Sequence, residues 1–308
     1  MGASINTNIA AMTALQSLSM TNKETLITQN RVSTGFRVND ASDNAAYWSI
    51  ATTMRGDRSS LSTVADALGL GSATAEIAAK GIESAIEIAG KIKDKLLAAR
   101  TPGVDRSKIQ SEIEELQASL QSTVDGATFN GQNWLSTDAT AATTTRTLVS
   151  AFSRLADGTI EIGTITVDLD AMRLVDTAAS GSASGILDTP TTTGSTTYTV
   201  LSLDISALTD DTADLALIVD MVNTVDAAIE DMTDAATSLG AVKTRIDIQK
   251  DFAKSLMDAI DTGVGQLVDA DMNEESTRLQ ALQVRSQLGV QALSMANQSA
   301  QLILRLFQ

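Results

Sequence analysis

Both ends of the chain carry the pattern of a long, mostly polar helix, and the segment between them does not. In residues 5–32 the apolar positions fall on one side of a predicted helix: Ile5, Ile9, Met12, Leu15 and Leu18. In residues 272–307 a similar stripe contains Leu279, Leu282, Leu288, Leu293, Leu302 and Leu306. Most helical stability comes from packing an apolar face against another element, and these stripes are narrow. We therefore expect the two ends to pair with each other and with neighbouring copies, which favours assembly over catalysis.

Further helices are predicted next to these ends, with apolar residues at spacings of three and four. Residues 45–100 form one long helix or two abutting ones, and residues 105–125 form another after the helix-breaking Pro102. The connection is short, so these helices are predicted to be antiparallel. Helix returns at residues 212–262. The positions expected to pack between these helices recur every three or four residues: Ile86, Ile92, Leu96, Ile113, Leu116, Leu120, Ile218, Val222 and Val225.

Capping residues mark several predicted helix ends. Gly35 can supply the left-handed position after the first helix. Asp43 or Asn44 is suited to cap the start of the next helix. Asp269 and Asp271 form an acidic cluster before the last helix, where a carboxylate stabilises free N–H groups.

The segment over residues 126–211 changes character. Asn130-Gly131 is a hairpin turn signal, and residues 160–169 and 198–203 alternate like strands. We expect a small β-rich domain at the far end of the helices. The predicted fold is therefore mainly α with a small β-rich insert: a long antiparallel helical bundle or coiled coil built from both chain ends, with an outer domain in the middle.

The amino-acid composition excludes most classes of catalytic site. The 308 residues include no Cys and no His, so thiol nucleophiles, imidazole bases and most zinc sites are excluded. Asp269, Asp271 and Asn273 copy the first three ligand positions of a calcium loop. That loop needs Gly at its sixth position and Glu at its twelfth, where this chain has Glu274 and Gln280. We expect no enzymatic activity, no metal and no cofactor.

The charge argues against two classes of partner. The formal net charge is −16, and no basic cluster interrupts it. Nucleic acids and anionic membrane surfaces both attract basic patches, so neither is an expected partner. No apolar run is long enough to cross a bilayer, and the first residues lack the basic and apolar regions of a cleavable signal peptide. We expect no membrane insertion.

The chain resembles a bacterial flagellin over roughly residues 3–135 and 215–308. The N-terminal motifs are Ser4-Ile-Asn-Thr-Asn8, Arg31-Val-Ser-Thr-Gly35, Arg37-Val-Asn39, Ala41-Ser-Asp-Asn-Ala-Ala46 and Phe129-Asn-Gly131 with Trp134-Leu135. The C-terminal motifs are Leu239-Gly-Ala-Val242, Arg245-Ile246, Asp269-Ala-Asp271, Gln287-Leu-Gly-Val290, Ala296-Asn-Gln298 and Leu304-Arg-Leu306. Tyr47-Trp48-Ser-Ile-Ala51 is similar to the alpha-proteobacterial members. The motifs follow the family's order along the chain, which makes the resemblance specific.

The resemblance implies a structural subunit that polymerises into the flagellar filament for swimming motility. It implies export of the unfolded chain through the flagellar type III channel, with an export chaperone and a filament cap as further partners. The polymer is built from this chain alone or together with other flagellins, and it lies outside the cell. The implied division is 1–44 for an inner-core helix and connector, 45–128 for rod helices, 129–211 for an outer segment, 212–268 for a rod helix and 269–308 for an inner-core helix.

The resemblance also bears on innate immune receptors. Residues 30–51 align with the segment that plant receptors read in many flagellins, but Asp40, Asn44, Tyr47 and Trp48 depart from the recognised pattern. Residues 91–99, where a Toll-like receptor contacts flagellins, are Lys-rich here in place of the usual Arg-containing pattern. Both departures argue against recognition.

Two other functions fit the same features. A minor hook–filament junction protein would use the same export route, although such proteins depart from flagellins in length and in the terminal motifs. A secreted coiled-coil adhesin would also carry long helices. Electron microscopy separates the three, because only a filament subunit forms helical tubes with a narrow lumen.

Overall fold

The computed structural model describes residues 8–139, 144–178, 184–194 and 196–306, with side chains as far as residue 298. Within these ranges the helices are α1 (Ile9–Thr34), α2 (Ala45–Ala99), α3 (Arg106–Gly126), α4 (Thr212–Val268) and α5 (Met272–Leu306). The strands are β1 (Thr128–Phe129), β2 (Gln132–Asn133), β3 (Ser136–Thr137), β4 (Thr145–Arg154), β5 (Ile160–Asp168), β6 (Val175–Asp176), β7 (Thr191–Thr193) and β8 (Thr196–Tyr198). The mainly helical fold with a β-rich middle segment is thus confirmed.

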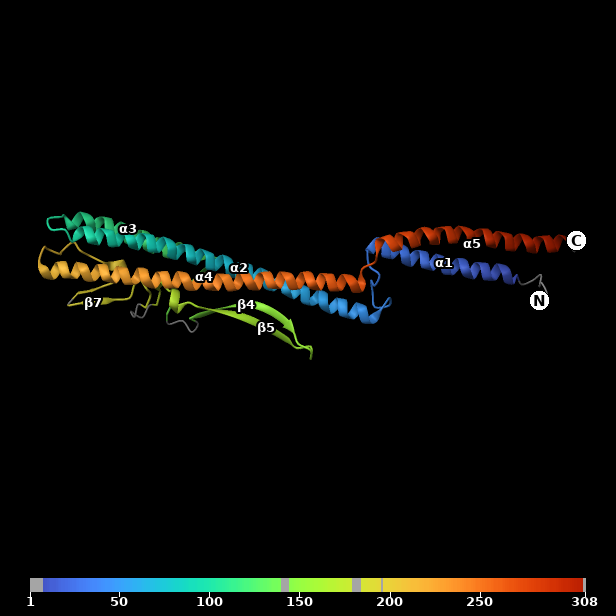
Figure 1. The fold of residues 1–308 in the computed structure, drawn as a ribbon, viewed down its shortest axis with the longest axis horizontal. Coiled ribbons are helices and arrows are strands. Elements are labelled where there is room, and N and C mark those ends of the chain that lie inside the picture. The colour runs from blue at the N-terminus through green and yellow to red at the C-terminus, as the bar shows by residue number, and fades with distance from the viewer. Residues whose placement is uncertain (1–7, 140–143, 179–183, 195, 307–308) are drawn as a thin grey trace. The chain divides into compact units, whose positions relative to one another are not determined.

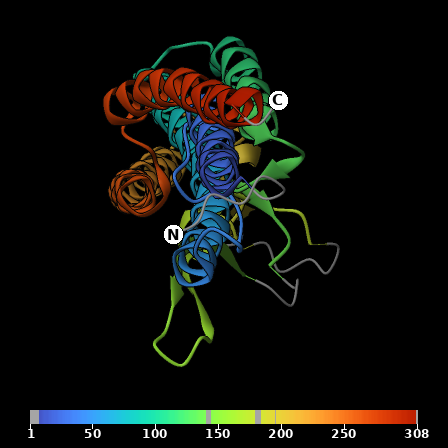
Figure 2. The ribbon, with the colours of Figure 1, turned by 90° about the vertical axis from the view of Figure 1, so that its right-hand side faces the viewer.

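The chain divides into two compact units, residues 1–58 with 258–308, and residues 59–257. In the first unit α1 and α5 lie side by side (Figures 1 and 2). Asn8 Nδ2 donates to the carbonyl of Ala296 at one end of the pair, and Arg31 bonds Glu275 at the other. The two helices therefore run antiparallel, as the sequence predicts.

The segments that lead into and out of this helix pair are joined by backbone hydrogen bonds. Gly35 has a φ of 76°, and its N–H closes the last turn of α1 on the carbonyl of Arg31, which confirms the predicted C-cap. Phe36 pairs with Asp269 as an isolated β-bridge. A small cluster of buried side chains lies beside this bridge: Val38, Ala51, Val264 and Val268. The connectors of the two chain ends thus form one packed junction.

Of the two candidate caps for α2, the side chain of Asn44 takes that role. Its Oδ1 accepts the N–H groups of Ala46 and Tyr47 at 3.1 Å. Asp43 instead accepts the N–H group of Asn39 inside the connector. The sequence left open one helix or two after this point, and α2 is a single helix of 55 residues.

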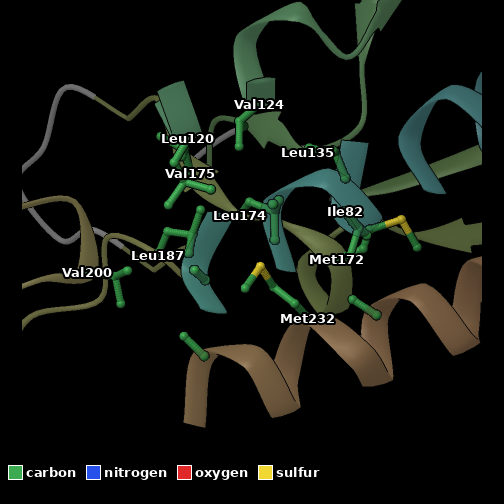
Figure 3. Close-up of a cluster of buried hydrophobic side chains, with 14 of the residues drawn as sticks. Ile82, Leu120, Val124, Leu135, Met172, Leu174, Val175, Leu187, Val200 and Met232 are labelled. Atoms are coloured by element: carbon green, nitrogen blue, oxygen red, sulfur yellow. The ribbon is translucent and has the colours of Figure 1, made fainter. Parts of the chain in front are cut away.

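In the second unit the helices and the insert share one hydrophobic core (Figure 3). The helices contribute Ile82 from α2, Leu120 and Val124 from α3, and Met232 from α4. The insert contributes Leu135, Leu174, Leu187 and Val200, all buried. The insert therefore does not sit at the far end of the helices as expected, because its apolar side chains complete the core along their sides.

Gly71 of α2 shows how closely the insert approaches the helices. A Cβ atom at this position would lie 2.7 Å from Leu148 Cδ1 of β4. The absence of a side chain at Gly71 thus makes room for the insert.

The strands form separate two-stranded pairs. The Asn130-Gly131 turn joins β1 to β2, and both residues have positive φ values, 50° and 74°, as such turns require. The strand predicted at 160–169 is present as β5, whereas its partner β4 was not predicted. The prediction of a strand at residues 198–203 is wrong. Tyr198 ends β8, and the Thr199 side chain caps a 3-10 turn at Val200–Ser202.

Candidate assembly surface

The seam between α1 and α5 is built mainly from small side chains. Along α1 the less exposed positions alternate by three and four residues: Ala11, Ala14, Leu18, Thr21, Thr25 and Thr28. Along α5 they alternate in the same way: Glu275, Leu279, Leu282, Ser286, Gly289, Leu293 and Ala296. This is the seven-residue repeat of a coiled coil. Side chains this small bury little apolar area but allow the two backbones to approach closely.

Gly289 shows the close approach directly. A Cβ atom at this position would lie 3.1 Å from Leu18 Cδ1, so the missing side chain makes room for Leu18. Near the same level the Ser286 hydroxyl donates to Asn22 Oδ1 at 3.4 Å.

A charge cluster closes the end of the seam next to the junction. Glu275 Oε1 accepts from Arg31 at 3.0 Å and from Arg278 at 3.4 Å. The Glu275 side chain is 6% exposed, and its Oε2 has no hydrogen-bond partner among the described atoms. Removing either guanidinium would leave a buried carboxylate with less compensation, which is more costly than the loss of an exposed ion pair.

Apart from Leu18, most of the large apolar side chains of α1 point away from this seam. Ile9, Met12 and Leu15 are 66%, 62% and 59% exposed. On α5, Leu288 and Met295 are 58% and 65% exposed. Exposed apolar groups that recur along one helix face indicate an interaction surface. We call this set the outer stripe: Ile9, Met12, Leu15, Val284, Leu288 and Met295.

The inner-core residues expected from the sequence therefore fall into three groups. Leu18, Leu279, Leu282 and Leu293 lie in the seam. Ile9, Met12, Leu15 and Leu288 lie in the outer stripe. Ile5 and the side chains of Leu302 and Leu306 lie outside the described part of the chain.

Apart from Val284, which precedes Arg285, the outer stripe lies in parts of the chain without ionisable side chains. Residues 2–22 contain none, and neither do residues 286–304. Covering a charged group on association carries a large desolvation cost, whereas covering these residues does not. The surface is therefore suited to burial against another protein surface.

The expected rod-layer residues lie in the core of the second unit. Six are fully buried: Ile92, Leu96, Ile113, Leu120, Ile218 and Val225. Ile86, Leu116 and Val222 are partly buried and pack against the same core.

Asp40 and Asp271 each accept hydrogen bonds from residues close to them in the chain. Asp271 Oδ1 accepts from the N–H groups of Asn273 and Glu274, so the predicted cap of α5 is confirmed. The pKa of Asp40 is held below its usual value mainly by a hydrogen bond from the Ser42 hydroxyl. Among the described residues no three Asp or Glu side chains gather as they would around a metal ion. The described helices also contain no apolar stretch that could cross a membrane.

Reading the sequence for large apolar residues identified four residues of the outer stripe and the four leucines of the seam, but it missed the small residues that make up the rest of the seam. The seam has a signal of its own, since Ala and Thr recur at the alternating spacing of a coiled coil from Ala11 to Thr28. A search for small residues at this spacing in both ends would have found it.

Comparison with known proteins finds family models that match both ends of the chain. The family model for the bacterial flagellin N-terminal helical region matches residues 5–140, and the one for the bacterial flagellin C-terminal helical region matches residues 222–307. The chain is 46% identical to Flagellin C of Rhizobium meliloti (strain 1021), with 99% of each protein covered. It is 38% identical to a Flagellin A of Rhizobium meliloti, with 99% of this chain and 100% of the relative covered. It is 42% identical to a flagellin of Brucella melitensis, with 99% of each covered.

Proposed function

Because the chain belongs to the bacterial flagellin family and is a structural subunit of the flagellar filament, we propose that α1 and α5 form the innermost layer of that filament. In this proposal α2, α3 and α4 form the layer around it. The observation that carries the proposal is the outer stripe, because its large apolar side chains face away from the partner helix. Burial of a single Leu or Met side chain contributes about 1.5–3 kcal/mol, so several together can hold neighbouring copies.

The residues have distinct roles in this arrangement. Leu18, Leu279, Leu282 and Leu293 hold α1 to α5 within one copy. Ile9, Met12, Leu15 and Leu288 contact neighbouring copies, and Ile5, Leu302 and Leu306 extend that contact toward the chain ends. The rod-layer residues keep the helices of the second unit together as the copies stack: Ile86, Ile92, Leu96, Ile113, Leu116, Leu120, Ile218, Val222 and Val225.

The remaining partners follow from the family. The chain passes unfolded through the flagellar type III channel with the help of an export chaperone, and it adds to the filament beneath a cap. The absence of Cys supports this route, because no disulfide can form before export. The product is extracellular and non-enzymatic, and the departures at Asp40, Asn44, Tyr47 and Trp48 disfavour recognition by innate immune receptors.

A deletion of residues 290–308 tests the proposed inner layer. It removes Leu293 and Ala296 from the seam and Met295 from the outer stripe. We expect polymerisation to be lost while the helices of the second unit remain folded, because their core contains no residue of that segment. Electron microscopy and circular dichroism measure the two results. Tubes with a narrow lumen formed by the deleted chain would show that the pair is not required.

Point variants give a finer test of the same layer. Met12→Gln with Leu15→Gln removes apolar area from the outer stripe and leaves the seam intact. We expect this pair to raise the monomer concentration at which filaments form. Thr13→Gln with Gln16→Asn changes two exposed residues of the same turns and serves as the control.

A further inference from the structure

We propose that three exposed side chains on α4, Arg245, Ile248 and Phe252, dock into a hollow between α2 and α3 of a second copy. We call these three residues the α4 strip. The inference rests on the proposed function, since it names one contact by which filament subunits hold each other outside the inner layer.

The α4 strip lies on the solvent side of its helix. Ile248 and Phe252 are 64% and 57% exposed, although Ile246 and Ala253 beside them are buried. Spacings of three and four residues place Arg245, Ile248 and Phe252 on one face. Arg245 is exposed and makes no ion pair with a described carboxylate. The strip therefore offers two apolar groups and one uncompensated positive charge.

The hollow has the complementary character. It measures about 470 Å³ and is lined by Lys95 of α2 and by Ser111, Glu112, Glu115 and Leu116 of α3. Its surface is mostly apolar, because Leu116 and the aliphatic stems of the longer side chains form it. Lys95 is already paired with Glu112. Glu115 is exposed and has no cationic partner in the described part of the chain, so it can receive Arg245.

The strip and the hollow cannot meet within one copy. Asp247 beside the strip accepts a hydrogen bond from Ser72 of α2, whereas the hollow contains Lys95 of the same helix. The rise of 1.5 Å per residue places these two levels about 35 Å apart. A contact between two different patches of identical copies is head-to-tail, and it builds an open helical chain when the rotation between successive copies does not close a ring. That is the kind of contact a filament requires.

Another exposed apolar pair in this unit fits the hollow less well. Ile160 and Ile162 of β5 are 54% and 59% exposed. Successive side chains of a strand point to opposite faces, so Glu161 lies on the other face of β5, and β5 contains no Lys or Arg that could pair with Glu115. The α4 strip is favoured because Arg245 brings the opposite charge to Glu115.

Cross-linking tests the contact directly, because the natural chain contains no Cys. Phe252→Cys and Ser111→Cys are made in separate chains, and both positions are exposed, so folding is preserved. The two proteins are mixed, polymerised and oxidised. We expect a covalent dimer in filaments and none in dilute monomer. Ile162→Cys mixed with Ser111→Cys is the matched control, and a dimer there with none from Phe252→Cys would overturn the proposal in favour of β5.

Charge reversal supplies a second measurement. Arg245→Glu and Glu115→Arg should each raise the monomer concentration needed for polymerisation about tenfold, as for a residue near the centre of an interface. The double reversal should restore it. Two results would contradict the inference and leave the proposed function standing, provided that the wild-type chain forms tubes. One is that both single variants polymerise as well as the wild-type chain, and the other is that the double reversal does not restore polymerisation. If the wild-type chain forms no tubes, the proposed function itself fails.

Discussion

At the residue scale, two glycines of α2 differ in the space around them. A Cβ atom at Gly81 would lie 2.7 Å from Leu135 Cδ1 and 2.9 Å from Ala127 Cβ, whereas Gly90 has open space. We expect Gly81→Ala to destabilise the second unit by about 1–3 kcal/mol, since Leu135 is fully buried and must shift. Gly90→Ala should stabilise it by about 0.5–1 kcal/mol, because alanine loses less backbone entropy in a helix. Urea unfolding followed by circular dichroism measures both, and equal effects would contradict the packing described.

Arg106 fixes the turn between α2 and α3 and supplies a pH-dependent contribution to stability. It is buried, donates to the carbonyl of Ala99 at 3.0 Å, and bonds Asp210 at 2.6 Å. This hydrogen bond is the main reason why the pKa of Asp210 is lowered. A lowered carboxyl pKa contributes stability that is present above about pH 4 and is lost as the pH falls through the lowered value.

The substitution Asp210→Asn should therefore lower the free energy of unfolding near pH 7 and have little effect near pH 2. Urea unfolding at the two pH values gives the comparison. Asp211→Asn is the control, because that neighbouring carboxylate makes no ion pair in the described structure. An equal loss of stability at both pH values would show that Asp210 acts through packing alone.

Single-residue signals were also the most predictable part of the fold. Gly35, Asn44 and Asp271 cap helices as expected, and Asn130-Gly131 forms the expected turn. Each depends on a local backbone preference that does not require knowledge of distant residues. The pairing of Leu18 with Gly289 could not be predicted in this way, because it depends on how two segments at opposite ends of the chain align.

At the scale of elements, the helices were predictable and part of the insert was not. The helices have long periodic patterns and clear stops such as Pro102. β4 was missed because its Thr-rich start resembles a loop and its register contains a bulge between Val149 and Ala151. Residues 198–203 alternate like a strand, but Thr199 caps a 3-10 turn at Val200–Ser202. This turn allows both Val200 and the following Leu203 to be buried.

The same scale gives a prediction for α1 and α5 in the free subunit. In the free subunit α1 buries little apolar area, because Ile9, Met12 and Leu15 are all more than half exposed. Ordering each residue costs about 1–2 kcal/mol of conformational entropy. We therefore expect both helices to be disordered in dilute monomer and to fold on assembly. Backbone NMR measures this, and rigid helices over residues 5–30 and 275–305 in the monomer would rule it out.

At the scale of the whole molecule, the distribution of charge governs how copies approach one another. The net charge is −16, yet residues 2–22 and 286–304 contribute only neutral side chains. The repulsion between copies therefore arises in the remaining parts of the chain. At 0.1 M salt, the repulsion between exposed charges more than about 10 Å apart is largely screened. We expect the monomer concentration required for polymerisation to decrease as the salt concentration rises from about 0.01 M to about 0.15 M, as measured by sedimentation. The opposite trend would indicate that attractive ion pairs dominate assembly.

The small-residue seam of α1 and α5 has a consequence for the life of the polymer. Because the seam contains few large side chains, most of the apolar area of this helix pair is removed from water only when a neighbouring copy covers it. Along an intact shaft every copy has its neighbours, and at a fracture some do not. A fracture would thus bare an adhesive surface on both faces of the break. Sheared fragments are expected to anneal end to end and to leave their flanks free of one another.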